Sequence, residues 1–181
     1  MNKKELDAYK LSNIIRYSQQ HKIKKESVAE HSFYVMLFIH QICEEFELDD
    51  RIKLLSLESG LLHDIPEIVT NDITYDVKQM VPEVCALLQP YEEAIIKEQC
   101  PRAHKTLFHP DTPAERLAKR IVKHADILSV LQYCRNEESL GNRHFVSLCW
   151  ETENRLEESK DELIKLIIQY TEMEGKRHAE K

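Results

Sequence analysis

The stretch TPAERLAKRIVKHADILSVLQYCRNEES, residues 112–139, is central to the fold because it has the periodicity of one long helix. Thr112 is a favourable N-cap, Pro113 suits the first turn, and Glu115 completes a capping box with Thr112. Gly141 follows the stretch and is a natural stop. The sequence therefore predicts a long amphipathic helix with defined ends.

One carboxylate interrupts the apolar face of this helix. Residues spaced by three and four form a stripe that consists of Val122, Asp126, Val130 and Tyr133. A carboxylate among apolar side chains needs a cation, a set of hydrogen-bond donors or a raised pKa. A metal ion near Asp126 would meet this need, and so would an ion pair with Arg16 or a lysine.

Most of the remaining chain also has helical periodicity, and no segment alternates in the manner of a strand. Ser27 and Glu30 predict a second capping box, Asp49 is a favourable cap, and Pro90 is expected to interrupt its helix. The expected helices span residues 4–19, 27–46, 49–64, 82–99, 112–139 and 145–173, with loops at 20–26, 71–78 and 100–111. These elements predict an all-α fold, a single-domain bundle of about six helices over residues 1–174 with a polar tail at 175–181.

The composition restricts the class of protein. With 181 residues, 42% of them apolar, the chain is long enough for one domain with a core. Three glycines disfavour a glycine-rich phosphate loop, and a net charge of −7 disfavours a polymeric nucleic acid as partner. Five cysteines without a C-x-x-C pair favour reduced thiols. Because we find neither a signal-peptide core nor an apolar run that spans a bilayer, we expect a cytoplasmic protein that does not enter membranes.

The segment GLLHDIPEIVTND, residues 60–72, brings a histidine and several carboxylates to the end of an apolar run. His63 and Asp64 close the third expected helix, and His31 lies one turn into the second. Each alone has an ordinary explanation, because single buried histidines and chance His-Asp pairs are common. Together with Asp126 they form a nitrogen and oxygen set that suits one divalent ion, Mn²⁺, Co²⁺, Fe²⁺, Zn²⁺ or Mg²⁺. Such a set leaves positions open for water, which is typical of catalysis.

The order of these residues resembles a known family. His31, then His63-Asp64, then Asp126 follow one another as in the HD-domain metal-dependent phosphohydrolases. Three segments, RYSQQHKIKKESVAEHS, LLHDIPEIVTNDITYDVK and KHADILSVL, are similar to the YfbR-like 5′-deoxynucleotidase branch. That branch has an arginine before an E-H-S motif, then H-D-x-x-E-x-x-x-x-D, then A-D. The similarity covers residues 10–145 and implies a helical bundle of the HD-domain type.

The resemblance also implies a role for each matching residue. The implied metal ligands are His31, His63, Asp64 and Asp126. The implied catalytic residues are Glu67, which would hold or polarise the attacking water, and Asp72, which would act as general acid or base near the leaving oxygen.

Three further residues are implied to contact the substrate. Arg16 would clasp the phosphate, a task that suits a planar cation with several donors. Lys78 would be a second phosphate contact, although a solvated loop lysine is an equally simple interpretation. Tyr17 stands where the family usually has a tryptophan, close to the sugar, which leaves the choice between deoxyribose and ribose open.

The function that the resemblance implies is hydrolysis of (deoxy)nucleoside 5′-monophosphates to nucleoside and phosphate, with one divalent ion as cofactor. A small nucleotide would be the substrate, and a homodimer is the expected assembly. One alternative is an HD-type hydrolase of a cyclic, polyphosphorylated or triphosphate nucleotide. Another is a helical module that binds a metal ion or nucleotide without catalysis.

Overall fold

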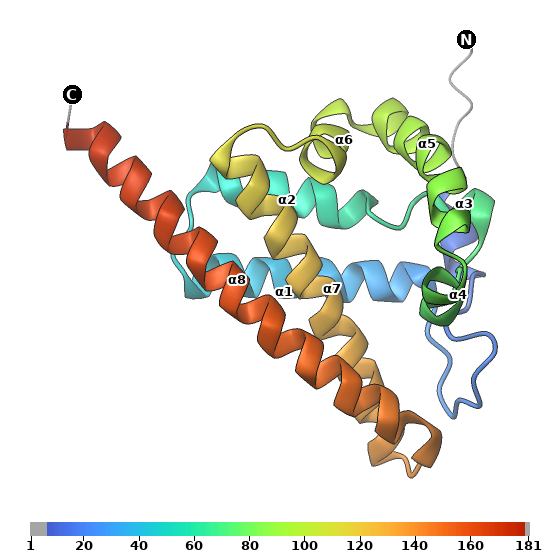
Figure 1. Ribbon diagram of the computed structural model, residues 1–181. Coiled ribbons are helices and arrows are strands. Elements are labelled where there is room, and N and C mark those ends of the chain that lie inside the picture. Colours follow the sequence, from blue (N-terminus) through green and yellow to red (C-terminus); the bar gives the residue numbers. More distant parts are fainter. Residues whose placement is uncertain (1–6, 180–181) are drawn as a thin grey trace.

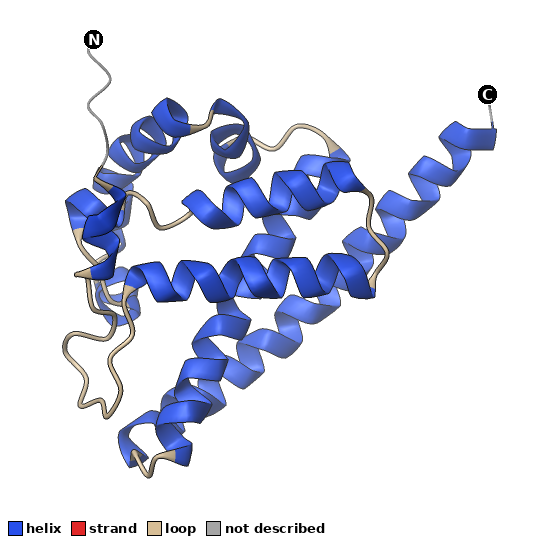
Figure 2. Ribbon diagram, turned by 180° about the vertical axis from the view of Figure 1, so that it is seen from behind, coloured by secondary structure: helices blue, strands red, loops and turns tan. Residues whose placement is uncertain are grey.

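The computed structural model in Figure 1 describes residues 7–179, without the side chains of residues 75, 76, 79 and 172–179. Over these residues the chain forms eight α-helices and two short 3-10 helices, and no named strand occurs among them. Figure 2 shows this all-helical architecture from behind. The elements are η1 (Ala8–Ser12), α1 (Val28–Glu45), α2 (Asp50–Leu62), α3 (Glu67–Thr70), α4 (Tyr75–Met80), α5 (Pro82–Gln99), α6 (Pro101–Phe108), α7 (Pro113–Ser139), η2 (Arg143–Phe145) and α8 (Val146–Ala179). The prediction of an all-α fold is therefore confirmed.

Helix α7 organises the core, because it packs against α1, α2, α6 and α8. Figure 1 shows α1 and α2 side by side, with α7 and α8 crossing them. The core between these helices contains fully buried aliphatic side chains, among them Ile39, Ile52, Leu117, Ile121 and Leu163. Burial of this apolar surface is the main force that holds the four long helices together.

The predicted capping boxes are present at α1 and α7. The Ser27 hydroxyl accepts the Glu30 amide, while a Glu30 carboxylate oxygen accepts the Ser27 amide at 2.7 Å. Thr112 and Glu115 make the same pair of contacts at the start of α7. Asp49 caps α2 by accepting the amide of Ile52. Local sequence therefore fixes where three of the four core helices begin.

The prediction of a helix at residues 4–19 is wrong within the described residues. Only Ala8–Ser12 is helical, in the tighter 3-10 form, and the chain then continues through turns and bends to residue 20. Ile15 forms an isolated antiparallel bridge with Ser27, and the amide of Arg16 donates to the carbonyl oxygen of Glu26 at 2.9 Å. These contacts across the loop replace the helical hydrogen bonds that the sequence pattern predicted.

The expected loops at 71–78 and 100–111 are wrong in part. Helix α4 begins after Thr74, and α6 follows Cys100, whose thiol accepts the amide of Ala103. Pro101 occupies the first turn of α6, where its missing amide costs nothing. Together with the short helix α3, α4 and α6 raise the number of α-helices in the described residues to eight, although the one expected at residues 4–19 is missing.

Pro90 does not interrupt α5, contrary to expectation. The residue whose carbonyl loses its partner, Ala86, is exposed, so water can satisfy that oxygen. The last helix also runs further than expected, to Ala179 instead of residue 173. In the described part of the chain, no helix is both long enough and apolar enough to cross a membrane. The proposed domain end at residue 174 stays a prediction.

Candidate functional site

His31 lies in the first turns of α1 and is fully buried. Its Nδ1 atom is 2.9 Å from the Ser129 hydroxyl on α7 and 2.6 Å from Nη1 of Arg16. These contacts fix the ring, so that Nε2 points toward the carboxylates of Asp64 and Asp126. The capping box at Ser27 sets this geometry indirectly, because it determines where the helix starts.

His63 and Asp64 follow the last residue of α2. Nδ1 of His63 donates to the carbonyl oxygen of Gly60 at 2.7 Å, since a carbonyl can only accept. In the neutral ring this places the lone pair on Nε2, which lies 3.2 Å from Oδ2 of Asp64. A histidine held through one nitrogen and aimed through the other has the orientation of a metal ligand.

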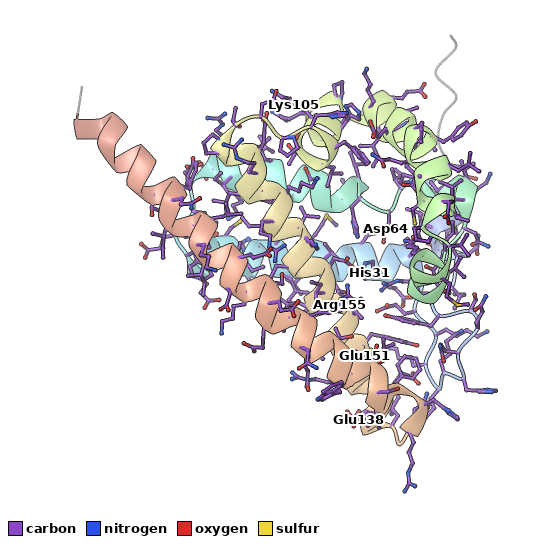
Figure 3. The ribbon with its side chains drawn as sticks, viewed as in Figure 1. His31, Asp64, Lys105, Glu138, Glu151 and Arg155 are labelled. Carbon is purple, nitrogen blue, oxygen red and sulfur yellow. The ribbon has the colours of Figure 1, made fainter. Side chains whose placement is uncertain are left out.

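Asp126 approaches the cluster from α7 through its contact with His31, whereas the group of ligand atoms that all lie within 4.8 Å of one another contains His31, His63 and Asp64. Oδ1 of Asp126 lies 3.2 Å from Nε2 of His31, and Oδ2 of Asp64 lies 3.4 Å from the same nitrogen. Ligand atoms that share one ion at about 2.0–2.2 Å are roughly 3.0–3.5 Å apart, so these separations fit. Figure 3 shows His31 and Asp64 near each other in the middle of the view.

The imidazole nitrogens provide the test of whether the residues fit a metal ion. Nε2 of His31 and Nε2 of His63 are both buried and have no hydrogen-bond partner in the described residues. Candidate ligand atoms of His31, His63 and Asp64 all lie within 4.8 Å of one another. An unpartnered buried polar atom is costly, and a cation between these atoms would satisfy both rings together.

The charges of the cluster depend on one another. Burial opposes ionisation of Asp64, yet the adjacent charges of His63 and His31 hold the pKa of Asp64 far below its usual value. Burial also opposes a charge on His63, but Asp64 raises the pKa of His63 to about 9. For Asp126, burial raises the pKa, but the close contact with His31 and the charge of that ring outweigh burial and lower it. The two carboxylates are thus poised as anions that attract a cation.

A cleft of about 330 Å³ opens above the cluster. Seven predicted site residues line this cleft, namely Arg16, Tyr17, Asp64, Glu67, Asp72, Lys78 and Asp126. His31 and His63 lie beneath the cleft and reach it through Asp64. The structure therefore brings together all nine residues from segments far apart in the sequence.

Glu67 begins the short helix α3, three residues after Asp64. Its Oε2 atom is buried without a hydrogen-bond partner. Burial, together with the negative charges of Asp64 and Asp72, raises the pKa of Glu67 to about 9. This carboxyl group therefore responds strongly to any positive charge that enters the cleft.

Arg16 and Tyr17 enter the cleft from the segment between η1 and α1. Nη1 of Arg16 pairs with Oε2 of Glu26 at 3.0 Å, while Asp126 faces His31. The alternative of a direct ion pair between Arg16 and Asp126 is therefore not formed.

Tyr17 has a positive φ of 55°. Its ring stacks on Tyr133 with centroids 4.9 Å apart, and the amide of Tyr17 donates to Oδ2 of Asp72 at 3.2 Å. This contact joins the two sides of the cleft. The side chain of Lys78 is exposed at the rim, on helix α4 and not in the expected loop.

Sequence reasoning missed several residues that support the site. The buried carboxylate of Glu137 accepts the amides of Ile23 and Lys24 at 2.7 and 2.6 Å. The Tyr133 hydroxyl donates to the carbonyl oxygen of Lys24 at 2.6 Å. The end of α7 thus holds the loop that leads back to Glu26, the partner of Arg16.

A signal for these supporting residues was present in the sequence. Glu137 continues the stripe of Asp126 and Tyr133 by one more turn, and Ser129 lies three residues after Asp126. Glu26, in contrast, gives no such signal, because it lies outside any helix and meets Arg16 only through the bridge between residues 15 and 27.

Comparison with known proteins identifies relatives of this chain. The family model described as "5'-deoxynucleotidase YfbR-like" matches residues 7–173. A 5′-deoxynucleotidase from Enterobacter sp. (strain 638) is 27% identical over an alignment of 177 positions, and the match covers 88% of this chain and 85% of that protein. A 4′-phosphooxetanocin A phosphatase from Priestia megaterium is 29% identical over an alignment of 157 positions, and the match covers 77% of this chain and 75% of that protein.

Solved structures share the fold. An HD-domain phosphohydrolase from Listeria innocua has a TM-score of 0.60 and 23% identity, covering 90% of this chain and 81% of that one. An HD phosphohydrolase of cyanophage S-2L, solved with dA and one catalytic Zn²⁺, has a TM-score of 0.61 and 20% identity, covering 92% and 95%. A conserved hypothetical protein from Pyrococcus furiosus has a TM-score of 0.66 and 22% identity, covering 90% and 95%.

Proposed function

This chain belongs to the YfbR-like 5′-deoxynucleotidase family, and we propose that it hydrolyses (deoxy)nucleoside 5′-monophosphates to nucleoside and phosphate with the help of one divalent metal ion. The observation that carries this proposal is the pair of buried nitrogens, Nε2 of His31 and Nε2 of His63, which make no hydrogen bond within the described residues and face carboxylate oxygens at 3.2–3.4 Å. They converge with Asp64 beneath a cleft that Arg16 and Lys78 supply with positive charge.

The proposed metal ligands are His31, His63, Asp64 and Asp126. When bound, a divalent ion supplies Lewis acidity: it lowers the pKa of water and neutralises charge on a phosphate. Two imidazoles with two carboxylates suit Mn²⁺, Co²⁺, Fe²⁺, Zn²⁺ or Mg²⁺, and the proposal covers each of these ions.

Glu67 is the proposed acceptor of the proton from the attacking water. Its Oε2 atom is buried at the cleft without a hydrogen bond, and the charge of Asp64 is close enough to act on it. The protein groups around Glu67 raise its pKa, and positive charge beside Asp64 would oppose that rise. Glu67 is then able to orient water toward phosphorus and to take its proton as the new oxygen–phosphorus bond forms.

Asp72 is the proposed donor to the leaving group. The amide of Tyr17 holds its Oδ2 atom at 3.2 Å, which fixes the carboxyl group at the edge of the cleft. As the bond between phosphorus and the 5′-oxygen breaks, Asp72 gives that oxygen a proton, so the nucleoside leaves with a neutral hydroxyl.

Arg16 and Lys78 are the proposed phosphate contacts. Arg16 offers a planar fork of donors and Lys78 a point charge, and both line the cleft. Tyr17 lies beside them, and its stacking on Tyr133 fixes the ring at the position proposed for the sugar. A phenol in place of an indole changes the polar group in contact with the sugar.

The direct test is a phosphate-release screen over ribo- and deoxyribonucleoside 5′-monophosphates, each with several divalent ions. We expect release from monophosphates and none from the Asp64→Ala protein, which serves as the blank. Release from cyclic or triphosphate nucleotides alone would support the alternative hydrolase. No release from any nucleotide, with metal still bound, would support a module that binds without catalysis.

A homodimer and a cytoplasmic location are also part of the proposal. Helix α8 exposes Trp150 and Ile168, and α1 exposes Phe33 and Leu37, which provides apolar surface for a second copy. Light scattering of the eluting protein should give twice the 21.4 kDa mass of one chain. A single-chain mass at all concentrations would contradict the dimer.

A further inference from the structure

A second group of metal-ligating side chains lies where α5 meets α6, and the proposed reaction makes no use of it. It consists of Glu93 on α5, His104 on α6 and His109 directly after α6. Oε2 of Glu93 is 3.1 Å from Nε2 of His109 and 3.4 Å from Nε2 of His104. We propose that these three residues form a second site for a divalent transition-metal ion, with Zn²⁺ as the best-suited ion.

A hydrogen bond within the protein already orients the carboxylate of this second site. Oε1 of Glu93 accepts the side-chain amide of Gln89, one turn earlier on α5, at 2.8 Å. This contact turns Oε2 toward the two imidazole rings. The side chain of Glu93 is only 21% exposed and that of His104 only 14%, so the ligands are partly withdrawn from water.

The two rings are also placed by their surroundings. His104 packs beside the ring of Phe108, and the backbone amide of His109 closes α6 by donating to the carbonyl oxygen of Lys105 at 2.9 Å. The centroids of the two imidazoles are 5.2 Å apart, and candidate ligand atoms of all three residues lie within 4.8 Å of one another. The segment 104–109 therefore presents two nitrogens to one carboxylate.

The chemistry of these ligands selects the kind of ion. Two imidazole nitrogens with one carboxylate oxygen suit Zn²⁺, whereas Mg²⁺ and Ca²⁺ prefer sites made of oxygen alone. The separations of 3.1 and 3.4 Å match those around a shared ion with bonds of about 2.0–2.2 Å. The side chain of His109 is 60% exposed, so a fourth position can hold water and ions can enter from solvent.

An ion at this place would fasten a weakly packed helix. Helix α5 buries only Ile96 among its described side chains, whereas α6 packs against α2 and α7. The ion would join α5 to α6 by three bonds and so tie α5 to the core. Helix α4, which carries Lys78 at the cleft, contacts α5 and would be steadied by the same link.

Metal counting on the full chain tests this inference without reference to activity. Protein stripped with a chelator and dialysed against a small excess of Zn²⁺ should retain two ions per chain. The doubly substituted His104→Ala, His109→Ala protein should retain one, as should Asp64→Ala. Combining all three substitutions should leave none.

Two controls keep the result interpretable. Glu93→Gln preserves the size of the side chain and the fold, and it should lose the second ion while circular dichroism stays unchanged. His40→Ala removes an exposed histidine that faces the carboxylate of Glu44 at 3.9 Å and belongs to no group of three ligands among residues 7–179, and it should retain both ions.

Two outcomes would overturn the inference. One is equal zinc content in the wild-type and the doubly substituted His104→Ala, His109→Ala proteins, since the three residues would then make only hydrogen bonds. The other is complete loss of zinc from Asp64→Ala. A failed phosphate-release screen leaves the second site standing if Asp64→Ala still retains one ion that the histidine substitutions remove.

Discussion

The four long helices α1, α2, α7 and α8 differ from the segment 67–108, which contains α3 to α6, in how firmly they are held. The long helices enclose the main core, while among its described side chains α3 buries none and α5 only Ile96. His31 and Asp126 belong to the long helices, and His63 and Asp64 directly follow α2. Glu67, Asp72 and Lys78 belong to the segment 67–108. The comparison indicates that the proposed metal ligands lie on or directly after the well-packed helices, whereas the proposed acid and base groups, Glu67 and Asp72, lie on the less buried segment.

The largest expected effect comes from removing a ligand at the end of a long helix. Asp64→Ala should lose the ion of the catalytic cluster and lower kcat by more than the roughly 10⁴-fold that one acid or base group supplies. Steady-state phosphate release and metal analysis measure both results. A substituted protein that keeps the ion and the rate would remove Asp64 from the proposed ligand set.

The next effect concerns the loosely held segment. Glu67→Gln and Asp72→Asn should each lower kcat by about 10²- to 10⁴-fold, because each removes a positioned acid or base. Both proteins should retain the metal of the catalytic cluster, since neither residue is a proposed ligand. Loss of that metal in either protein would mean that the substituted residue helps to bind the ion, and the proposed division between metal ligands and acid or base groups would be wrong.

A matched pair of aliphatic substitutions compares the two regions directly. Ile121→Ala on α7 removes a fully buried side chain and should lower the free energy of unfolding by about 2–5 kcal/mol. Leu87→Ala on α5 removes a side chain that is 69% exposed and should change the free energy of unfolding by about 0.5 kcal/mol at most. Urea titration measures both. Equal losses would show that α5 is packed as firmly as α7.

The smallest effect is the acid sensitivity of one helix cap. Burial opposes the charge of Glu115, but the amides of Thr112 and Asp111 hold its pKa at about 2. Because this pKa is lower in the folded than in the unfolded chain, the charge stabilises the fold above roughly pH 4.5, and the contribution is lost as the pH falls toward 2. Glu115→Gln should lower the unfolding free energy at pH 7 by about 1 kcal/mol and flatten this part of the acid dependence.

A control separates the cap from general charge effects. Glu157→Gln removes an exposed carboxylate on α8 and should leave the acid dependence between pH 4.5 and 2 as in the wild type. Thermal unfolding at several pH values compares the two proteins. The same flattening in both would mean that the capping box does not cause it.

The firm region is also the region that sequence predicted best. Capping boxes at Ser27 and Thr112 and the cap at Asp49 mark helix starts through contacts between residues three apart. The looser region was predicted less well, because α4 has no side-chain cap and α6 uses Cys100, an unusual cap, before Pro101. Local sequence signals predict a helix end only where nearby side chains accept the unpaired backbone amides at that end.

By itself, the sequence determined the all-α class, the ends of the core helices and the order of the histidines and aspartates that resembles one family. Tertiary structure alone decided that His31, His63 and Asp64 converge with Asp126 beside His31, that Glu26 pairs with Arg16, and that Glu93 meets His104 and His109. The physical reason is range. Caps and periodicity act within a few residues, whereas convergence depends on how burial of apolar faces, which has no preferred direction, packs one helix against another.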